Sequence, residues 1–115
     1  MRASYRLLDI EEKFSEIVDR IVPIEIDETA IKVILFLKDG SNLRVVELWE
    51  NEKLKRYSYY WLTPKNELII GWDNAPHHTQ MDTFPHHKHI KLQNNVQPSK
   101  EKYLEEVMSK ILQNQ

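Results

Sequence analysis

The chain has 115 residues, of which 41% are hydrophobic and 30% are charged, and its formal net charge is -2. This size and composition are typical of one globular domain and exclude an intrinsically disordered chain. The absence of cysteine excludes disulfides and thiolate zinc sites, and no apolar run approaches the roughly 20 residues of a membrane span. Because no signal peptide is recognisable, we expect a cytoplasmic protein that forms a single domain over residues 1–115.

The first predicted element is an amphipathic helix over residues 9–22. Asp9 and Glu12 have the spacing of a capping box, and Pro23 is expected to end the helix because it lacks a backbone N–H. A short extended edge segment is predicted over residues 23–27. The apolar residues that recur at helical spacing in this helix are Ile10, Phe14, Ile17, Val18 and Ile21.

In the middle of the chain, apolar residues recur at every second position, and this period predicts strands. Asp39-Gly40 suits a tight reversal, and the short loops between strands favour an antiparallel meander. A closing helix is predicted from an N-cap at Ser99, with apolar residues facing the core. We therefore predict an α+β fold with an N-terminal helix, a four- to five-stranded antiparallel meander and a C-terminal helix. The expected strands cover residues 31–37, 43–49, 55–62, 68–72 and 88–92.

The five histidines of the chain lie within 13 positions, between residues 77 and 89. A packed core has little use for so many imidazoles, whereas groups that titrate near neutral pH suit proton transfer. In an extended segment, His87 and His89 share one face and Lys88 lies on the other. We therefore predict His87 and His89 as acid and base, and we include the remaining candidates of the cluster, which are His77, His78 and His86.

Asp73 and Asn74 follow a predicted strand directly and precede the histidines. Asp73 could orient a histidine, so both residues join the predicted catalytic set. The alternative is turn chemistry, because aspartate and asparagine side chains often cap the local backbone.

Cleavage of RNA needs only such a base and acid, since RNA carries its own nucleophile in the 2′-hydroxyl. Residues 53–100 hold 7 basic and 3 acidic side chains, a local net charge of +4 that suits a polyanion. Arg56 and Lys88 are the predicted phosphate partners, and Tyr57 and Tyr59 are predicted to contact RNA. The alternative for both tyrosines is packing in the core, on the strand face that they share with Trp61.

Metal binding is a competing use of the same histidines. His77 and His78 together with His87 and His89, or Asp73 as an oxygen ligand, could hold zinc or another divalent ion. A third interpretation is an interaction domain whose histidines cap a loop.

Three segments also resemble the TumE family of toxins of toxin-antitoxin systems. They are the Tyr57-Ser58-Tyr59 segment, Trp72-Asp73-Asn74 and the closing His87-Lys88-His89. The predicted order of elements is similar, at the level of architecture, to ribonuclease toxins of the RelE and barnase type. The resemblance implies a toxin with a cognate antitoxin protein as its partner.

Together these observations predict a cytoplasmic toxin that acts as a metal-independent ribonuclease through its histidine cluster. RNA and an antitoxin are the expected partners, no membrane is involved, no cofactor is expected, and a homodimer remains open. The alternative is a metal- or ligand-binding interaction domain that works without catalysis through a protein partner, with zinc as its cofactor.

Overall fold

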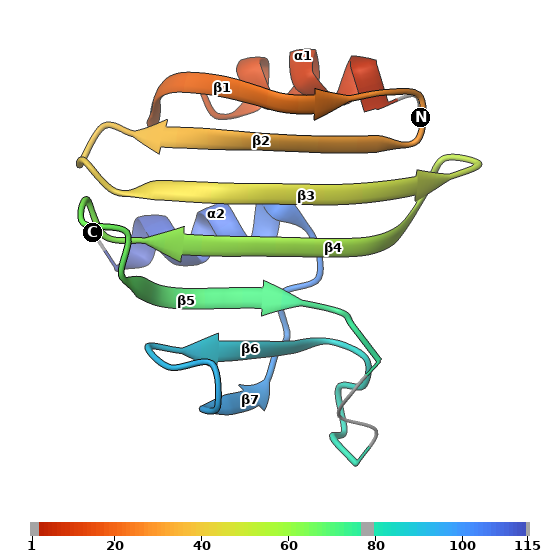
Figure 1. Ribbon diagram of the computed structural model, residues 1–115, viewed down its shortest axis with the longest axis vertical. Coiled ribbons are helices and arrows are strands. Elements are labelled where there is room, and N and C mark those ends of the chain that lie inside the picture. The colour runs from red at the N-terminus through yellow and green to blue at the C-terminus, as the bar shows by residue number, and fades with distance from the viewer. Residues whose placement is uncertain (1–2, 77–79, 115) are drawn as a thin grey trace.

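A computed structural model describes residues 3–76 and 80–114. Seven strands form one antiparallel sheet, in which each strand lies beside the strand that precedes it in the chain (Figure 1). The predicted meander is thus confirmed, but it has seven strands and not four or five. The strands are β1 (Val18–Ile26), β2 (Ala30–Leu37), β3 (Asn42–Glu50), β4 (Lys53–Leu62), β5 (Leu68–Asp73), β6 (His87–Ile90) and β7 (Val96–Pro98).

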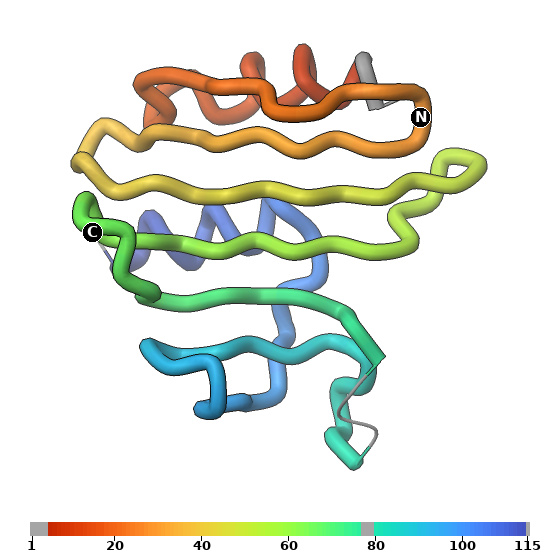
Figure 2. The backbone as a smooth tube through the Cα atoms, in the orientation of Figure 1, coloured from red at the N-terminus to blue at the C-terminus, as the bar shows by residue number. Residues whose placement is uncertain are grey.

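Two helices, α1 (Ala3–Lys13) and α2 (Leu104–Gln113), pack on one face of this sheet (Figure 1). After β7 the chain passes behind β6 and β5, so that α2 returns to the middle of the sheet (Figure 2). The core lies between the helices and the sheet. Its fully or almost fully buried side chains include Ile10, Val33, Leu35, Val45, Tyr59, Trp72, Leu104, Val107 and Ile111. No helix of the described ranges is long and apolar enough to cross a membrane.

The prediction of a helix over residues 9–22 was wrong in its bounds. The helix ends at Lys13, and Val18–Ile26 forms the edge strand β1. A register shift between Val18 and Arg20 explains the error, because it lets residues three apart point to the same face of a strand. Pro23 does not end a helix. It lies within β1, where an edge strand tolerates its missing N–H.

The closing helix also differs from the prediction. It begins at Leu104 after Tyr103, and Ser99 is a buried residue whose hydroxyl donates to the carbonyl oxygen of Glu101. Residues 99–103 carry the chain back from β7, so the helix cannot start at Ser99. Strand β7, which contains Pro98 and is not among the predicted strands, completes the sheet.

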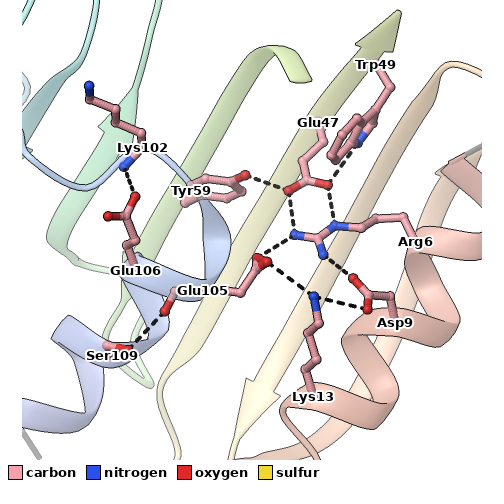
Figure 3. A network of polar contacts seen from close by, with 10 residues as sticks. All are labelled: Arg6, Asp9, Lys13, Glu47, Trp49, Tyr59, Lys102, Glu105, Glu106 and Ser109. Carbon is pink, nitrogen blue, oxygen red and sulfur yellow. Dashed lines mark hydrogen bonds and ion pairs between the residues drawn. The ribbon is translucent and has the colours of Figure 1, made fainter. Parts of the chain in front are cut away.

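A buried polar network ties both helices to the sheet (Figure 3). The guanidinium of Arg6 on α1 donates to both carboxylate oxygens of Glu47 on β3, at 2.8 and 3.1 Å, and to Glu105 on α2 at 3.1 Å. Glu47 is fully buried and also accepts from the hydroxyl of Tyr59 and the indole N–H of Trp49. Burial lowers the pKa of Arg6, but Glu47 and Glu105 outweigh it, so this pKa lies above its ordinary value.

Candidate functional site

The register of strands β4, β5 and β6 brings the predicted site residues together on the face of the sheet opposite the helices. Asp73 on β5 is paired with Ser58 on β4 and with His87 on β6. Two residues before Asp73 on β5, Gly71 is paired with Tyr60 on β4 and with His89 on β6. Because directly paired residues point to the same face, these side chains form two adjacent rows across the sheet.

At the centre of these rows, one carboxylate joins two imidazoles. Nε2 of His87 lies 2.8 Å from Oδ1 of Asp73, and Nε2 of His89 lies 3.2 Å from Oδ2. The two rings meet edge to face, with their centroids 5.1 Å apart. The three side chains are mostly buried, with exposed fractions of 13% for Asp73, 3% for His87 and 10% for His89. We refer to them below as the Asp–His–His cluster.

The other ring nitrogens of the cluster face backbone carbonyls. Nδ1 of His87 lies 3.0 Å from the carbonyl oxygen of Pro85, and Nδ1 of His89 lies 2.7 Å from that of Gln93. Since a carbonyl oxygen only accepts, each Nδ1 carries the proton and donates it. These bonds fix the orientation of both rings and direct both Nε2 atoms toward Asp73.

The carboxylate of Asp73 is itself held in place. The backbone N–H of Ala75 donates to Oδ1 at 3.0 Å, and the hydroxyl of Tyr60 donates to Oδ2 at 3.4 Å. Burial and the charge of Asp73 both raise the pKa of Tyr60, which keeps the hydroxyl protonated as a donor. The cluster is therefore oriented from the backbone and from strand β4.

Gly71 allows the Tyr60 ring to lie across the sheet toward His89. A Cβ at Gly71 would come within 2.9 Å of two atoms of the Tyr60 ring, which is closer than any side chain tolerates without movement. The centroids of the Tyr60 and His89 rings are 6.1 Å apart. A larger residue at this position would therefore have to displace the Tyr60 ring.

A pocket of about 380 Å³ opens over the cluster. Its wall combines the three cluster residues with a guanidinium, a hydroxyl and two tyrosines. It is lined by Arg56, Tyr57, Ser58, Tyr60, Asp73, Ala75, His87 and His89. Arg56 is exposed, so a cation stands at the rim of the pocket.

His86, the remaining predicted histidine among the described residues, does not join the cluster. Nδ1 of His86 lies 2.9 Å from the hydroxyl of Tyr57, in a separate pocket on the helix side with Lys102 and Tyr103. Burial, followed by the charge of Lys102, lowers the pKa of His86. His77 and His78 lie outside the described residues.

Asn74 has a structural position next to the cluster. Its side-chain oxygen accepts from the backbone N–H of Tyr57 at 2.9 Å, and its amide donates to the carbonyl oxygen of Lys55 at 3.0 Å. Asn74 thus binds the start of strand β4 with both ends of its amide, as the alternative of backbone capping predicts. Asp73 combines such capping, through Ala75, with contacts to both histidines.

Three of the residues predicted to bind RNA lie on the helix side. Tyr57 and Tyr59 are buried, with 4% and 0% exposure, so their placement favours core packing over contact with RNA. Lys88 points away from the histidines and lies 3.6 Å from Glu101. Of the four predicted RNA contacts, Arg56 and the buried Tyr57 line the pocket of the cluster, and Arg56 is the exposed one of the two.

Sequence reasoning missed Tyr60, Ser58 and Arg44, which share the face of the cluster. Arg44 is paired with Tyr60 across β3 and β4, and Ser58 is paired with Asp73. The alternation of β4 contained the signal, because residues 58 and 60 must point away from Tyr57 and Tyr59. Choosing between the two faces required the pairing register, which the sequence does not specify.

Comparison with family models identifies one match, Toxin TumE, over residues 6–114. The chain belongs to the TumE toxin family. The match covers α1 from residue 6 onward, α2 and all seven strands, so the family resemblance of the three short segments extends to nearly the whole fold. Searches of curated proteins and of solved structures give no match.

Proposed function

We propose that this TumE-family protein is a ribonuclease toxin whose active site is the pocket over the Asp–His–His cluster. The observation that carries the proposal is the convergence of two imidazoles and one carboxylate beneath a pocket with a cation at its rim. Membership in a toxin family supports the biological role, and the composition of the pocket supports the reaction.

RNA suits this pocket because its 2′-hydroxyl supplies the nucleophile. The protein then has to remove one proton, supply another to the leaving oxygen, and hold the phosphate. His87, His89 and the hydroxyl of Tyr60 are the groups that exchange protons within the pocket. Arg56 at the rim is the proposed phosphate partner, because a guanidinium binds phosphate oxygens in a bidentate way.

The helix-free face supports binding of an extended RNA chain. Its exposed cations are spread over four neighbouring strands, with Glu25 as an opposing charge beside Lys32. Arg44 lies in the same row as His89 and three strands away, roughly 14 Å at the usual strand spacing. These exposed cations are Arg20, Lys32, Arg44 and Arg56.

The proposed setting is the cytoplasm, where the substrate RNA is present and where a cognate antitoxin protein would neutralise the toxin. A toxin of this kind is expected to stop growth when it is produced without its antitoxin. Growth inhibition therefore gives a second readout besides cleavage.

The test compares RNA cleavage and growth inhibition by the wild-type protein and two matched variants. His89→Ala is expected to abolish both activities, because it removes one imidazole from the cluster. Lys102→Ala, which removes an exposed cation on the helix side, is expected to retain both. Purified protein is incubated with total RNA from pH 5 to 8, with and without a chelator.

Intact RNA in every condition, at high protein concentration, would refute the ribonuclease proposal. It would favour the alternative of a binding module that acts through a protein partner. Cleavage that persists in His89→Ala would show that the cluster is not the active site.

A further inference from the structure

We infer that the Asp–His–His cluster binds one divalent transition-metal ion, of which Zn²⁺ is the best match. The sequence predicts a metal-independent ribonuclease, with metal binding by the same histidines as the alternative. Here we infer the alternative. It changes the role of His87 and His89 in the proposed function from proton transfer to metal binding, and its catalytic meaning rests on that function, but metal binding itself can be measured without RNA.

The first argument concerns protons. A neutral imidazole carries one N–H, and in both rings the Nδ1–H is used by a backbone carbonyl. When both rings are neutral, each Nε2 presents a lone pair toward a carboxylate oxygen of Asp73, at 2.8 or 3.2 Å. Such an arrangement needs a positive charge between the facing atoms, which is either a proton on each Nε2 or one metal ion bound by all three residues.

The second argument concerns size. The ligand atoms of Asp73, His87 and His89 all lie within 4.8 Å of one another. Zinc–nitrogen and zinc–oxygen bonds of about 2.0–2.1 Å give ligand–ligand separations of about 3.3 Å in a tetrahedron. The observed 2.8 and 3.2 Å are slightly shorter, so a small movement of the three side chains makes room for an ion.

The third argument concerns the surroundings of the ligands. Metal-binding histidines usually donate their second ring N–H to a carbonyl or carboxylate, and ligating carboxylates are themselves hydrogen-bonded. Both histidines here donate to carbonyls, and Asp73 accepts from the Ala75 N–H and the Tyr60 hydroxyl. The hydrogen-bonding groups that usually orient metal ligands are thus present around all three residues.

The ligand types point to the class of metal. Two imidazoles with one carboxylate suit zinc, nickel, iron or cobalt, whereas Mg²⁺ prefers sites made only of oxygen. Three protein ligands leave at least one coordination position for a molecule from the pocket, which is typical of catalytic rather than structural zinc sites. A bound ion of this kind supplies positive charge for phosphate oxygens and makes a bound water more acidic.

The experiment uses full-length protein without an affinity tag, freed of metal by dialysis against a chelator. Zn²⁺ is titrated by calorimetry, Co²⁺ is titrated as a spectroscopic probe, and Mg²⁺ is the control ion. We expect one Zn²⁺ or Co²⁺ per chain and cobalt absorption typical of nitrogen and oxygen ligands. At 100 times the dissociation constant, Zn²⁺ should raise the melting temperature by roughly 10 °C, and Mg²⁺ should not.

Two histidine variants test the assignment of ligands. His89→Ala should weaken binding by more than the roughly 10- to 100-fold that loss of an outer-shell partner costs. His86→Ala, which removes the neighbouring histidine on the helix side, should bind like the wild type. Circular dichroism establishes that both variants are folded, and the wild-type titration does not depend on either variant.

The outcomes separate the two proposals. No binding by folded wild-type protein at millimolar Zn²⁺, or unchanged binding in His89→Ala, would overturn the inference. Metal binding without RNA cleavage would support the inference and refute the ribonuclease proposal. RNA cleavage that persists in the presence of the chelator, by protein that binds no metal, would support the ribonuclease proposal and overturn the inference of a metal site.

Discussion

Replacing Glu47 by alanine should be among the most damaging single changes in this fold, although Glu47 is far from the proposed active site. The variant removes four hydrogen bonds that converge on one fully buried carboxylate, two from Arg6 and one each from Trp49 and Tyr59. The side chain of Arg6, only 4% exposed, would retain Asp9 and Glu105 as partners, which are 24% and 44% exposed. Its charge would therefore be poorly compensated.

Removing one partner from a buried ion pair typically costs about 3–5 kcal/mol of unfolding free energy. A domain of 115 residues has roughly 6–17 kcal/mol in total, so Glu47→Ala should lose a large part of its stability. Urea unfolding, followed by tryptophan fluorescence, measures this difference. The matched control is Glu50→Ala on the same strand, whose carboxylate is 65% exposed and 4.0 Å from Lys55. It should change the unfolding free energy by less than about 0.5 kcal/mol.

A double variant tests the reason for the loss. Replacing Arg6 by methionine and Glu47 by leucine removes both charges and keeps apolar volume, so it should be more stable than Glu47→Ala alone. A cost below about 1 kcal/mol for Glu47→Ala would contradict this reasoning. So would a double variant that is less stable than the single one, because the uncompensated charge would then not be the cause.

Three further predictions concern the site and one turn. Gly71→Ala should displace the Tyr60 ring and cost about 1–3 kcal/mol of unfolding free energy, and an unchanged chemical shift of the Tyr60 ring protons would contradict it. Asn74→Ala should cost about 1–3 kcal/mol, measured by urea unfolding, since it leaves the backbone N–H of Tyr57 without its acceptor. The pKa of Asp27 is lowered by hydrogen bonds from the backbone N–H groups of Thr29 and Ala30. The ionised Asp27 carboxylate therefore contributes fully to the free energy of unfolding above the unfolded-state pKa of about 3.9. This contribution is lost as the pH falls through the lower pKa of the folded state. Asp27→Ala should accordingly be less stable than wild type at pH 6, and the two should converge toward pH 2.

The sequence predicts best those parts of the fold in which the apolar residues follow one period, that of a strand or that of a helix. Burial alternates with a period of two along β2 and over most of β3 and β4, and Asp39-Gly40 forms the predicted reversal, with Gly40 at a φ of +94°. The start of the chain was mispredicted because the register shift near Val18 imitates helical spacing within a strand. The three residues of β7 are too few to show a period, so their pairing with β6 could be recognised only in the structure.

For the site, alternation alone placed His87 and His89 on one face and Lys88 on the other. The sequence could not show that Asp73 lies opposite His87, because this depends on the register of β5 against β6 across a loop of 13 residues. For the same reason, sequence reasoning selected Tyr57 and Tyr59 and missed Tyr60. Family resemblance pointed to the segments that contain Asp73, His87 and His89, and the pairing of strands determined which of their side chains meet.

The edge strand β1 also bears on how the protein avoids aggregation. An open sheet edge is a template on which another chain can add a strand, and β1, with nine residues, is the longer of the two edge strands of this sheet, since β7 has three. Pro23 removes one donor from β1, and two register irregularities bend the strand on either side of it. The features that made this segment hard to predict therefore make it a poor surface for edge-to-edge growth. A Pro23→Val variant should accordingly form oligomers more readily at high concentration.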